Sequence, residues 1–276
     1  MTRLDDFISV KPTSALEEYI DSYYFHSCDN PKSDLVYTYY PHVKHAITIY
    51  TGSTVRTVRN ETFVKPQTSK FTVLYSTVRE QPHRVEIKGA FKKVGIVFKS
   101  HGINRFIQRP LKEFHHQTIS SFEEWSPAFQ HVTAQIWQTQ DINERIALIE
   151  AFLNSQKVNN FNEHFHEMIT DIVKSENVES VQSLSQQYGL NRKTLYRTFS
   201  RELNCNPSKF LKILRFRKSL EKYLQTDHIN LTEAAAAQFY DQSDFIKNVR
   251  QITALTPKKL TKEISDLKHS IFWKIE

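Results

Sequence analysis

Two stretches in the C-terminal half of the chain carry basic, amide and hydroxyl side chains at spacings that place them on one helix face. In the first stretch, this face comprises Arg192, Lys193, Tyr196, Arg197, Ser200 and Arg201. In the second, it comprises Gln242, Ser243, Ile246, Lys247 and Arg250. Arginine and lysine can pair with guanine O6 and N7 in the major groove of DNA, and glutamine can pair with adenine N6 and N7. The two faces therefore suit recognition of double-stranded DNA.

Each face belongs to a unit that occurs twice, with an offset of fifty positions and no gap. Each copy predicts a helix, a short turn and a second helix, because apolar residues recur at helical spacing on both sides of a capping residue. Asn191 caps the second helix of the first copy, and Asp241 takes the same place in the second copy. The matching pairs are Val181 and Leu231, Leu184 and Ala234, Leu190 and Tyr240, Leu195 and Phe245, Phe199 and Val249, Pro207 and Pro257, and Phe210 and Leu260.

A linker helix is predicted between the two copies. Asn206 is placed to cap it, Pro207 suits its first turn, and the helical pattern continues to about Leu224. At about 1.5 Å per residue this helix spans roughly 27 Å, a little less than one turn of B-DNA, which is about 34 Å. The alternative is an ordinary helical bundle with solvated basic faces. That alternative does not explain why turn, cap, core and basic face recur together at one spacing.

The run from Val181 to Leu224, followed by the run from Leu231 to Leu260, resembles the DNA-binding domain of the AraC/XylS family of bacterial transcription regulators. The resemblance covers about residues 160–265 and is most specific in DQSDFIKNVRQITALTPKKL. It implies two helix-turn-helix units that read successive major grooves on one face of the duplex. By family position, the residues implied to read bases are Lys193, Tyr196, Arg197, Gln242, Ser243, Ile246 and Lys247.

Other polar residues of the two units suit contact with phosphate groups. Arg201 is expected to bind the DNA backbone, together with Thr194, Ser200 and Arg250, and such contacts set the register without reading sequence. The chain departs from the family pattern in the turn of the second unit. Gln238 and Phe239 stand there in place of the usual glycine.

In the N-terminal half, the period of the sequence changes to two. Runs that begin at Leu35, Lys44, Lys70, His83 and Lys92 alternate apolar or aromatic with polar residues, which predicts an antiparallel barrel or sandwich. An amphipathic helix is predicted over residues 12–24, with Leu16, Tyr19, Ile20 and Tyr23 on one side. Further helices are predicted over residues 103–108, 120–138 and 141–156.

The segments PTSALEEYIDSYYF and KKVGIVFKSHGINRFI resemble the N-terminal domains of a subset of AraC-type regulators, which contain a cupin-like barrel. This resemblance implies a domain that senses a small molecule or mediates dimerisation. Two patterns in this half leave alternatives open. The helical stripe of Ile142, Ile146, Ile149, Phe152 and Leu153 suits packing against the barrel and a dimer seam equally well. The many aromatic residues favour a packed core over an apolar ligand pocket.

The expected fold class is α+β. Residues 1–158 are expected to form a cupin-like antiparallel β barrel with flanking helices, responsible for effector sensing, dimerisation or both. Residues 159–276 are expected to form an all-α DNA-binding domain of two helix-turn-helix units joined by a linker helix. The polar run over residues 154–160 is the expected interdomain linker.

Composition and motifs limit the other classes of function. The net charge of +7 favours a polyanionic partner, and two distant cysteines, Cys28 and Cys205, fit a reducing cytoplasm. No apolar run predicts a signal peptide or a membrane span. The twelve histidines lack the spacing of a metal site, and nucleotide-binding, hydrolase and zinc-protease motifs do not occur. We therefore expect a protein that is not an enzyme and needs no cofactor or metal.

The sequence thus predicts a cytoplasmic bacterial transcription regulator, an activator or a repressor, that binds double-stranded DNA. A small-molecule effector, RNA polymerase and a second copy of the chain are further candidate partners, the last as a homodimer or in a monomer–dimer equilibrium. The alternative is a constitutive DNA-binding protein whose barrel is a protein-interaction module. A barrel with enzymatic activity is a less favoured alternative.

Overall fold

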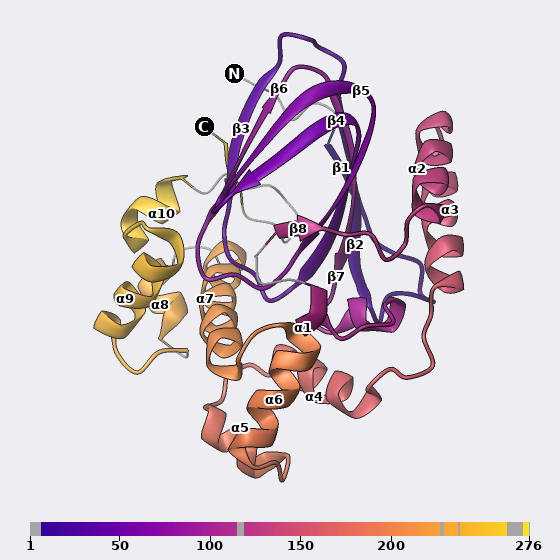
Figure 1. Cartoon of the computed structure of the whole chain (residues 1–276). Helices are drawn as coiled ribbons and strands as arrows, with labels where there is room; N and C mark the ends of the chain where they lie inside the picture. The colour runs from indigo at the N-terminus through magenta and orange to yellow at the C-terminus, as the bar shows by residue number, and fades with distance from the viewer. Residues whose placement is uncertain (1–6, 115–118, 227–228, 237, 264–272, 276) are drawn as a thin grey trace. The chain divides into compact units, whose positions relative to one another are not determined.

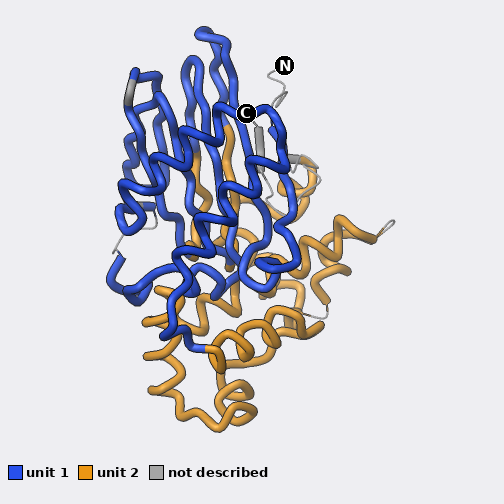
Figure 2. The backbone as a smooth tube through the Cα atoms, turned by 90° about the vertical axis from the view of Figure 1, so that its right-hand side faces the viewer, with its two compact units in different colours: residues 1–36, 44–77, 85–162 blue, residues 37–43, 78–84, 163–276 orange. Residues whose placement is uncertain are grey.

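The computed structural model describes residues 7–114, 119–226, 229–236, 238–263 and 273–275. As predicted, the fold is α+β, with a curled antiparallel sheet followed by a series of helices (Figure 1). The chain divides into two compact units (Figure 2). Unit 1 comprises residues 1–36, 44–77 and 85–162, and unit 2 comprises residues 37–43, 78–84 and 163–276. Two short stretches of the first half of the chain therefore belong to the helical unit.

The sheet contains all five strands that the two-residue period predicted. Its order is β1-β2-β7-β4-β5-β6-β3-β9, and β8 pairs with β5 outside this order. The strands are β1 (Phe7–Val10), β2 (Ile20–Cys28), β3 (Asp34–Tyr39), β4 (His45–Val58), β5 (Glu61–Ser76), β6 (His83–Lys88), β7 (Phe91–Phe98), β8 (Ile119–Ser121) and β9 (Trp273–Ile275).

Helices follow the sheet in unit 1 and cover one of its faces. They are the 3-10 helix η1 (Gly102–Phe106) and the α-helices α1 (Leu111–Phe114), α2 (Ala128–Gln138) and α3 (Ile142–Ser155). Ile146, Ile149 and Leu153 of α3 join Ile49 and Val94 of the sheet in one buried hydrophobic cluster. Of the two interpretations of the α3 stripe, packing against the sheet is therefore the one that the structure supports.

A buried carboxylate anchors α3 to the N-terminal strands. Glu150 is 7% exposed and accepts hydrogen bonds from the backbone nitrogen of Thr13 at 2.8 Å and from the Tyr23 hydroxyl at 3.2 Å. The Thr13 hydroxyl donates a third bond to the same carboxylate, at 2.5 Å. A buried carboxylate is tolerated only when hydrogen bonds replace its lost water, so these three donors fix the position of the helix.

The helix predicted over residues 12–24 is wrong. A turn occupies residues 14–19, and strand β2 begins at Ile20. Tyr23 and Phe25 pair with Ile96 and Val94 of β7 and enter the hydrophobic cluster of unit 1. The spacing of the apolar residues fits a helix locally, but pairing with β7 satisfies the backbone and buries Tyr23 and Phe25 on one face.

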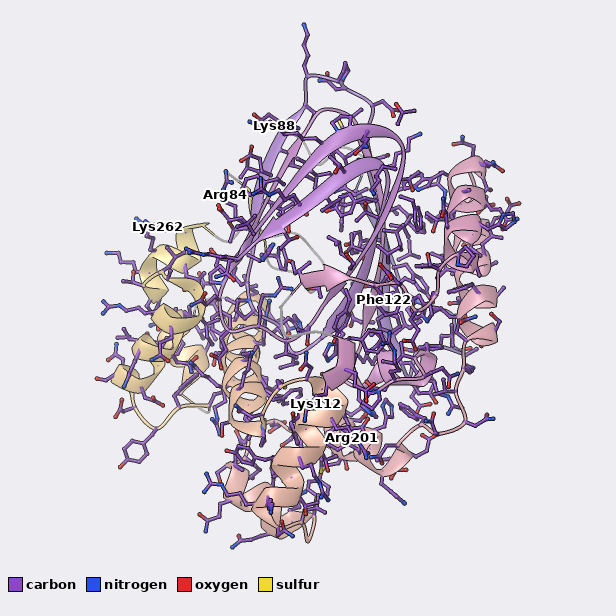
Figure 3. The ribbon with its side chains drawn as sticks, viewed as in Figure 1. Arg84, Lys88, Lys112, Phe122, Arg201 and Lys262 are labelled. Atoms are coloured by element: carbon purple, nitrogen blue, oxygen red, sulfur yellow. The ribbon has the colours of Figure 1, made fainter. Side chains whose placement is uncertain are left out.

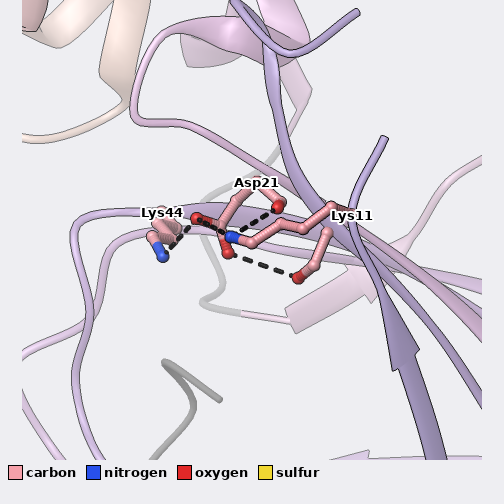
Figure 4. A network of polar contacts seen from close by, with 4 residues as sticks. Lys11, Asp21 and Lys44 are labelled. Atoms are coloured by element: carbon pink, nitrogen blue, oxygen red, sulfur yellow. Dashed lines mark hydrogen bonds and ion pairs between the residues drawn. The ribbon is translucent and has the colours of Figure 1, made fainter. Parts of the chain in front are cut away.

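A small ionic network lies at the start of β2 (Figure 4). The Asp21 carboxylate is 2.8 Å from the Lys44 ammonium and 4.0 Å from the Lys11 ammonium. Lys11 also donates to the main-chain carbonyl of Asp21 at 3.2 Å. Asp21 therefore links the residues that precede β2 to those that precede β4.

Unit 2 contains the predicted helical pairs and the linker helix between them. Its helices are α4 (Glu163–Lys174), α5 (Val181–Gln187), α6 (Arg192–Leu203), α7 (Pro207–Gln225), α8 (Leu231–Ala235), α9 (Gln242–Thr253) and α10 (Pro257–Glu263). The predicted caps Asn191, Asn206 and Asp241 each accept a hydrogen bond from a backbone nitrogen three residues later. Among the helices of the described ranges, none combines the length and apolar character that a membrane span requires.

Candidate nucleic-acid interface

The first helix-turn-helix unit consists of α5 and α6. Gly189 turns the chain between them with φ of 60°, a left-handed conformation that glycine adopts without steric cost. Leu195 and Phe199 of α6 are fully buried. The ring centroid of Phe199 lies 5.3 Å from that of Phe165 and 5.6 Å from that of Phe210. This packing orients α6 so that its opposite face is exposed.

The exposed face of α6 carries three predicted contact residues. Lys193, Arg197 and Arg201 are all exposed, and Figure 3 labels Arg201. The Arg201 guanidinium donates from Nε to the Glu202 carboxylate at 2.8 Å. Because the Arg201 side chain is 55% exposed, solvent screens this ion pair, and a phosphate group can compete for the guanidinium.

Tyr196, the third predicted base-reading residue on α6, lies against the start of α7. Its hydroxyl is 2.8 Å from the Ser208 hydroxyl, and the Arg192 guanidinium lies 5.6 Å from its ring centroid. The hydrogen bonds from Ser208 and Arg192 lower the pKa of Tyr196. The hydroxyl is therefore positioned beside the first turn of α7.

The second helix-turn-helix unit consists of α8 and α9. Asn230 and Glu233 form a capping box at the start of α8, in which each side chain bonds to the other residue's backbone nitrogen. Phe245 of α9 is buried, and its ring centroid is 5.3 Å from that of Phe239. Phe239, one of the two residues at which the turn departs from the family pattern, thus contributes to the core.

The predicted contact residues of α9 differ in exposure. Gln242, Ser243 and Lys247 are exposed. Ile246 is partly buried and packs against the hydrophobic cluster around Phe245. The exposed part of α9 is therefore polar and basic.

Helix α7 joins the two helix-turn-helix units and contributes to both of their cores. At about 1.5 Å per residue, its 19 residues span about 28 Å. Phe210 and Leu214 pack into the hydrophobic cluster of the first unit, whereas Phe216 and Leu220 pack into that of the second. The linker helix is therefore a structural spacer between the two recognition helices.

Two segments that the sequence did not connect with the helical unit also enter its cores. Val43 and Val78 pack in the cluster of the first helix-turn-helix unit, and Tyr40 packs in that of the second. Arg217 of α7 is 2% exposed and donates to the main-chain carbonyls of Pro41 at 2.6 Å and Tyr40 at 2.7 Å. One signal was present: Arg217 falls on the apolar stripe of α7 that also contains Ile213, Phe216 and Leu220.

The contact of Arg217 with Tyr40 and Pro41 places a positive charge in the protein interior. Burial lowers the pKa of Arg217 to about 9; nearby Arg79 also lowers it, whereas Glu221 raises it. The Arg79 guanidinium lies 4.1 Å from the centroid of the Tyr39 ring. Arg217 remains a cation at neutral pH, and the two carbonyl dipoles compensate for part of its lost hydration.

Two parts of the chain match families of known domains. Residues 184–263 match the family described as a helix-turn-helix domain. Residues 8–120 match a domain family of unknown function, DUF6597. No curated protein matches the chain.

Several solved structures are similar to this chain at low identity. One is a protein of unknown function from Listeria innocua, with 23% identity and a TM-score of 0.31, covering 34% of this chain and 91% of that protein. ToxT from Vibrio cholerae has 8% identity and a TM-score of 0.43, covering 92% of this chain and 95% of ToxT. ToxT with a bound unsaturated fatty acid has 13% identity and a TM-score of 0.40, covering 84% and 96%. These TM-scores are too low to support a conclusion about this chain.

The C-terminal helices carry the match to the helix-turn-helix family. The matched residues 184–263 include both recognition helices and α7, and the same residues carry the two capped units with their exposed polar faces. Residues 184–263 therefore form an AraC-type helix-turn-helix domain, and the protein is a DNA-binding transcription regulator.

Proposed function

We propose that the protein binds DNA sequence-specifically by placing α6 and α9 in two successive major grooves. The observation that carries this proposal is the pair of capped helices, each with a buried apolar face and an exposed polar face, on either side of one 19-residue helix. A spacer of about 28 Å suits two grooves separated by one helical turn of about 34 Å.

The exposed side chains take different roles in this proposal. Lys193 and Arg197 on α6 and Gln242, Ser243 and Lys247 on α9 read base edges. Tyr196 also reads bases from α6. Ile246 also reads bases from α9, where the methyl groups of its side chain suit contact with a thymine methyl. Arg201 binds phosphate and contributes affinity without sequence preference.

Selection of bound sequences from a random duplex pool at two salt concentrations tests the proposal. The expected result is an enriched site with two short blocks separated by about ten base pairs. Binding that shows no enrichment and vanishes at the higher salt concentration would mean that the basic faces are general polyanion surfaces. Such binding would be purely electrostatic and would fall steeply with added salt.

We also propose that the N-terminal part, residues 1–158, holds a small-molecule effector and that residues 159–276 carry DNA binding. A polar row across four strands of unit 1 favours the effector. Thr72, Tyr50, Lys93 and His26 are paired in succession from β5 through β4 and β7 to β2, so their side chains share one face. The alternate residues of these strands, including Ile49 and Val94, belong to the hydrophobic cluster on the other face.

The row contains the groups that recognise a polar ligand. Lys93 is 1% exposed, and its ammonium lies 5.9 Å from the ring centroids of Tyr24 and Phe91 and 6.0 Å from that of Tyr50. Burying an ammonium group is costly, so such a group in a domain interior points to a functional site. The Thr72 hydroxyl is buried and has no hydrogen-bond partner among the residues that the structure describes.

Thermal melting with a panel of small organic acids and polyols tests this second proposal. An effector is expected to raise the melting temperature of the natural protein, because binding to the folded state alone stabilises it. The Lys93→Met variant should show a much smaller rise. An equal rise in both proteins would place the ligand elsewhere.

A further inference from the structure

The loop between α4 and α5 is held by side chains from two other parts of unit 2. We define the α4–α5 loop as residues 175–180. It directly precedes α5, the first helix of the first helix-turn-helix unit. Lys218 and Arg215 of α7 donate hydrogen bonds to the backbone of this region, and so does the Gln238 side chain of the second helix-turn-helix unit. Its backbone is therefore a meeting point of all three parts of the DNA-binding structure.

The contacts from α7 satisfy carbonyl groups at a helix end. The Lys218 ammonium donates to the carbonyls of Val173 at 2.7 Å and Ser175 at 2.5 Å, at the C-terminus of α4. A helix C-terminus leaves its last carbonyls without intrahelical partners and attracts a positive charge. Arg215 donates to the carbonyl of Glu179 at 2.8 Å, just before α5. These bonds fix the α4–α5 loop on the linker helix.

The contact from the second unit comes from the turn between α8 and α9. The Gln238 side chain donates from Nε2 to the carbonyl of Glu176 at 2.6 Å. Its Oε1 accepts a hydrogen bond from the backbone nitrogen of Val178 at 3.2 Å. The amide therefore uses one donor and one acceptor on the three-residue stretch 176–178, and this pair of bonds defines both position and orientation.

Charge supports the same connection. Burial lowers the pKa of Arg215, whereas the nearby carboxylates of Asp244 and Glu179 raise it. Asp244 lies in the first turn of α9 and Glu179 lies in the α4–α5 loop. The Arg215 guanidinium thus interacts electrostatically with an acidic residue of the second recognition helix and with one that precedes the first helix-turn-helix unit.

The two bonds of the Gln238 side chain could not be made by a glycine, the residue that is usual in this turn. The second unit departs from the family pattern at Gln238 and Phe239, where a glycine is usual. Glycine has no side chain and cannot bond to Glu176 or Val178. The departure therefore adds a direct tie between the two helix-turn-helix units, in addition to their shared packing on α7.

We infer that Gln238 is a positioning residue that fixes the second recognition helix relative to the first, so that the protein selects the spacing between its two DNA blocks. This inference rests on the proposed reading of two major grooves. A one-base-pair change in spacing rotates the second block by about 34° and moves it by about 3.4 Å, given about 10.5 base pairs in each turn of about 34–36 Å. Two helix-turn-helix units that are fixed relative to each other cannot adjust to such a change in spacing, whereas two units that move more freely can.

The test uses the full chain and duplexes that carry the two selected blocks at the preferred spacing, or one or two base pairs closer or farther apart. A duplex that carries the first block alone measures the first unit by itself. The variants are Gln238→Ala, which removes both bonds, and Gln238→Glu, which keeps an acceptor for Val178 but has no donor for Glu176. Gln225→Ala is the matched control, because Gln225 is an exposed glutamine of α7 outside both recognition helices.

The natural protein and Gln225→Ala should lose affinity sharply when the spacing changes. Gln238→Ala should bind the preferred spacing about tenfold more weakly, a coupling of ordinary size between two sites. Its affinity should vary less with spacing, and its affinity for the first block alone should be unchanged. Gln238→Glu should lie between Gln238→Ala and the natural protein.

Two outcomes would overturn the inference. A Gln238→Ala spacing profile that superimposes on that of the natural protein would show that the tie does not set spacing. Equal loss of binding to the single-block duplex would show that Gln238 supports folding of the domain and not the placement of one helix. A natural protein that prefers no spacing at all would instead contradict the two-groove reading itself.

Discussion

Arg217 donates a hydrogen bond of 2.7 Å to the main-chain carbonyl of Tyr40, although 177 positions separate the two residues in the sequence. The Tyr40 side chain packs in the core of the second helix-turn-helix unit, and the guanidinium is buried beside it on the linker helix. The segment over residues 37–43 is therefore part of the DNA-binding structure. It is held there by a charged hydrogen bond as well as by apolar packing.

Replacing Arg217 with alanine should destabilise unit 2. The change removes two charge-assisted bonds and leaves the carbonyls of Tyr40 and Pro41 without this donor, at an expected cost of about 3 kcal/mol. Arg217→Lys should recover part of the loss, because an ammonium can reach only one carbonyl well. Urea denaturation of both variants measures the effect, and equal stability of Arg217→Ala and the natural protein would contradict the structural role.

Arg197→Ala and Arg201→Ala should affect DNA binding in different ways. Loss of Arg197 should relax the preference at one or two base pairs and cost about 1–3 kcal/mol there. Loss of Arg201 should weaken all duplexes similarly and reduce the salt dependence by about one phosphate. Binding assays on single-base variants of the selected site at several salt concentrations separate the two effects. An unchanged base preference in Arg197→Ala would mean that another side chain of α6 reads those positions.

Truncating a core phenylalanine should affect its own helix-turn-helix unit. Phe199 and Phe245 are at most 1% exposed and belong to separate hydrophobic clusters. Each change to alanine should cost about 3–5 kcal/mol. Hydrogen exchange should show lost protection mainly in α5 and α6 for Phe199→Ala, and in α8 and α9 for Phe245→Ala. Tyr240→Ala is the control: its side chain is 98% exposed, and the change should alter stability by less than about 0.5 kcal/mol.

The stability of unit 1 should rise with pH above neutrality because of Lys93. Burial lowers the pKa of Lys93 from its ordinary value of 10.5 to about 7. Between these values the unfolded chain binds more protons than the folded chain, so the free energy of unfolding increases with pH, by at most about 1.4 kcal/mol per pH unit. Below about pH 7 both states hold the proton and the contribution levels off.

Urea denaturation from about pH 7 to about pH 9 checks this expectation. His26 does not titrate in this range, because burial and the nearby Lys93 lower its pKa to about 2. Lys93→Met keeps a side chain of similar length without the charge, so its stability should vary less with pH. The same slope in the variant and in the natural protein would assign the pH dependence to another group.

The elements that sequence predicted well are those that local rules determine. Asn191, Asn206 and Asp241 cap helices because their side chains accept bonds from backbone nitrogens only three residues away. Leu195 and Phe199 are buried because helical spacing alone places them on one face. The strands β3 to β7 follow from a two-residue period over runs long enough to exclude a helix.

The features that sequence did not predict depend on partners far away in the chain. The apolar spacing of Leu16, Tyr19, Ile20 and Tyr23 fits a helix, but pairing with β7 converts Ile20–Cys28 into a strand. Gln238 was recognised as a departure from the family pattern, yet its bond to Glu176 spans 62 positions. No local pattern specifies such a contact. The base-reading residues on α6 and α9 remain predictions, since their roles depend on the bound duplex.

Residues 37–43 and 78–84 belong to the helical unit. Their position in the sequence limits where the chain can be cut or recombined. A fragment that begins after residue 158 lacks Tyr40, Val43 and Val78, and three buried positions in its two cores lose their side chains. A chimera that joins these helices to the first half of another regulator inherits foreign residues at the same positions. A single junction after residue 158 therefore separates the helical unit from three residues of its own cores, and exchange between regulators has to keep three separate pieces of sequence together.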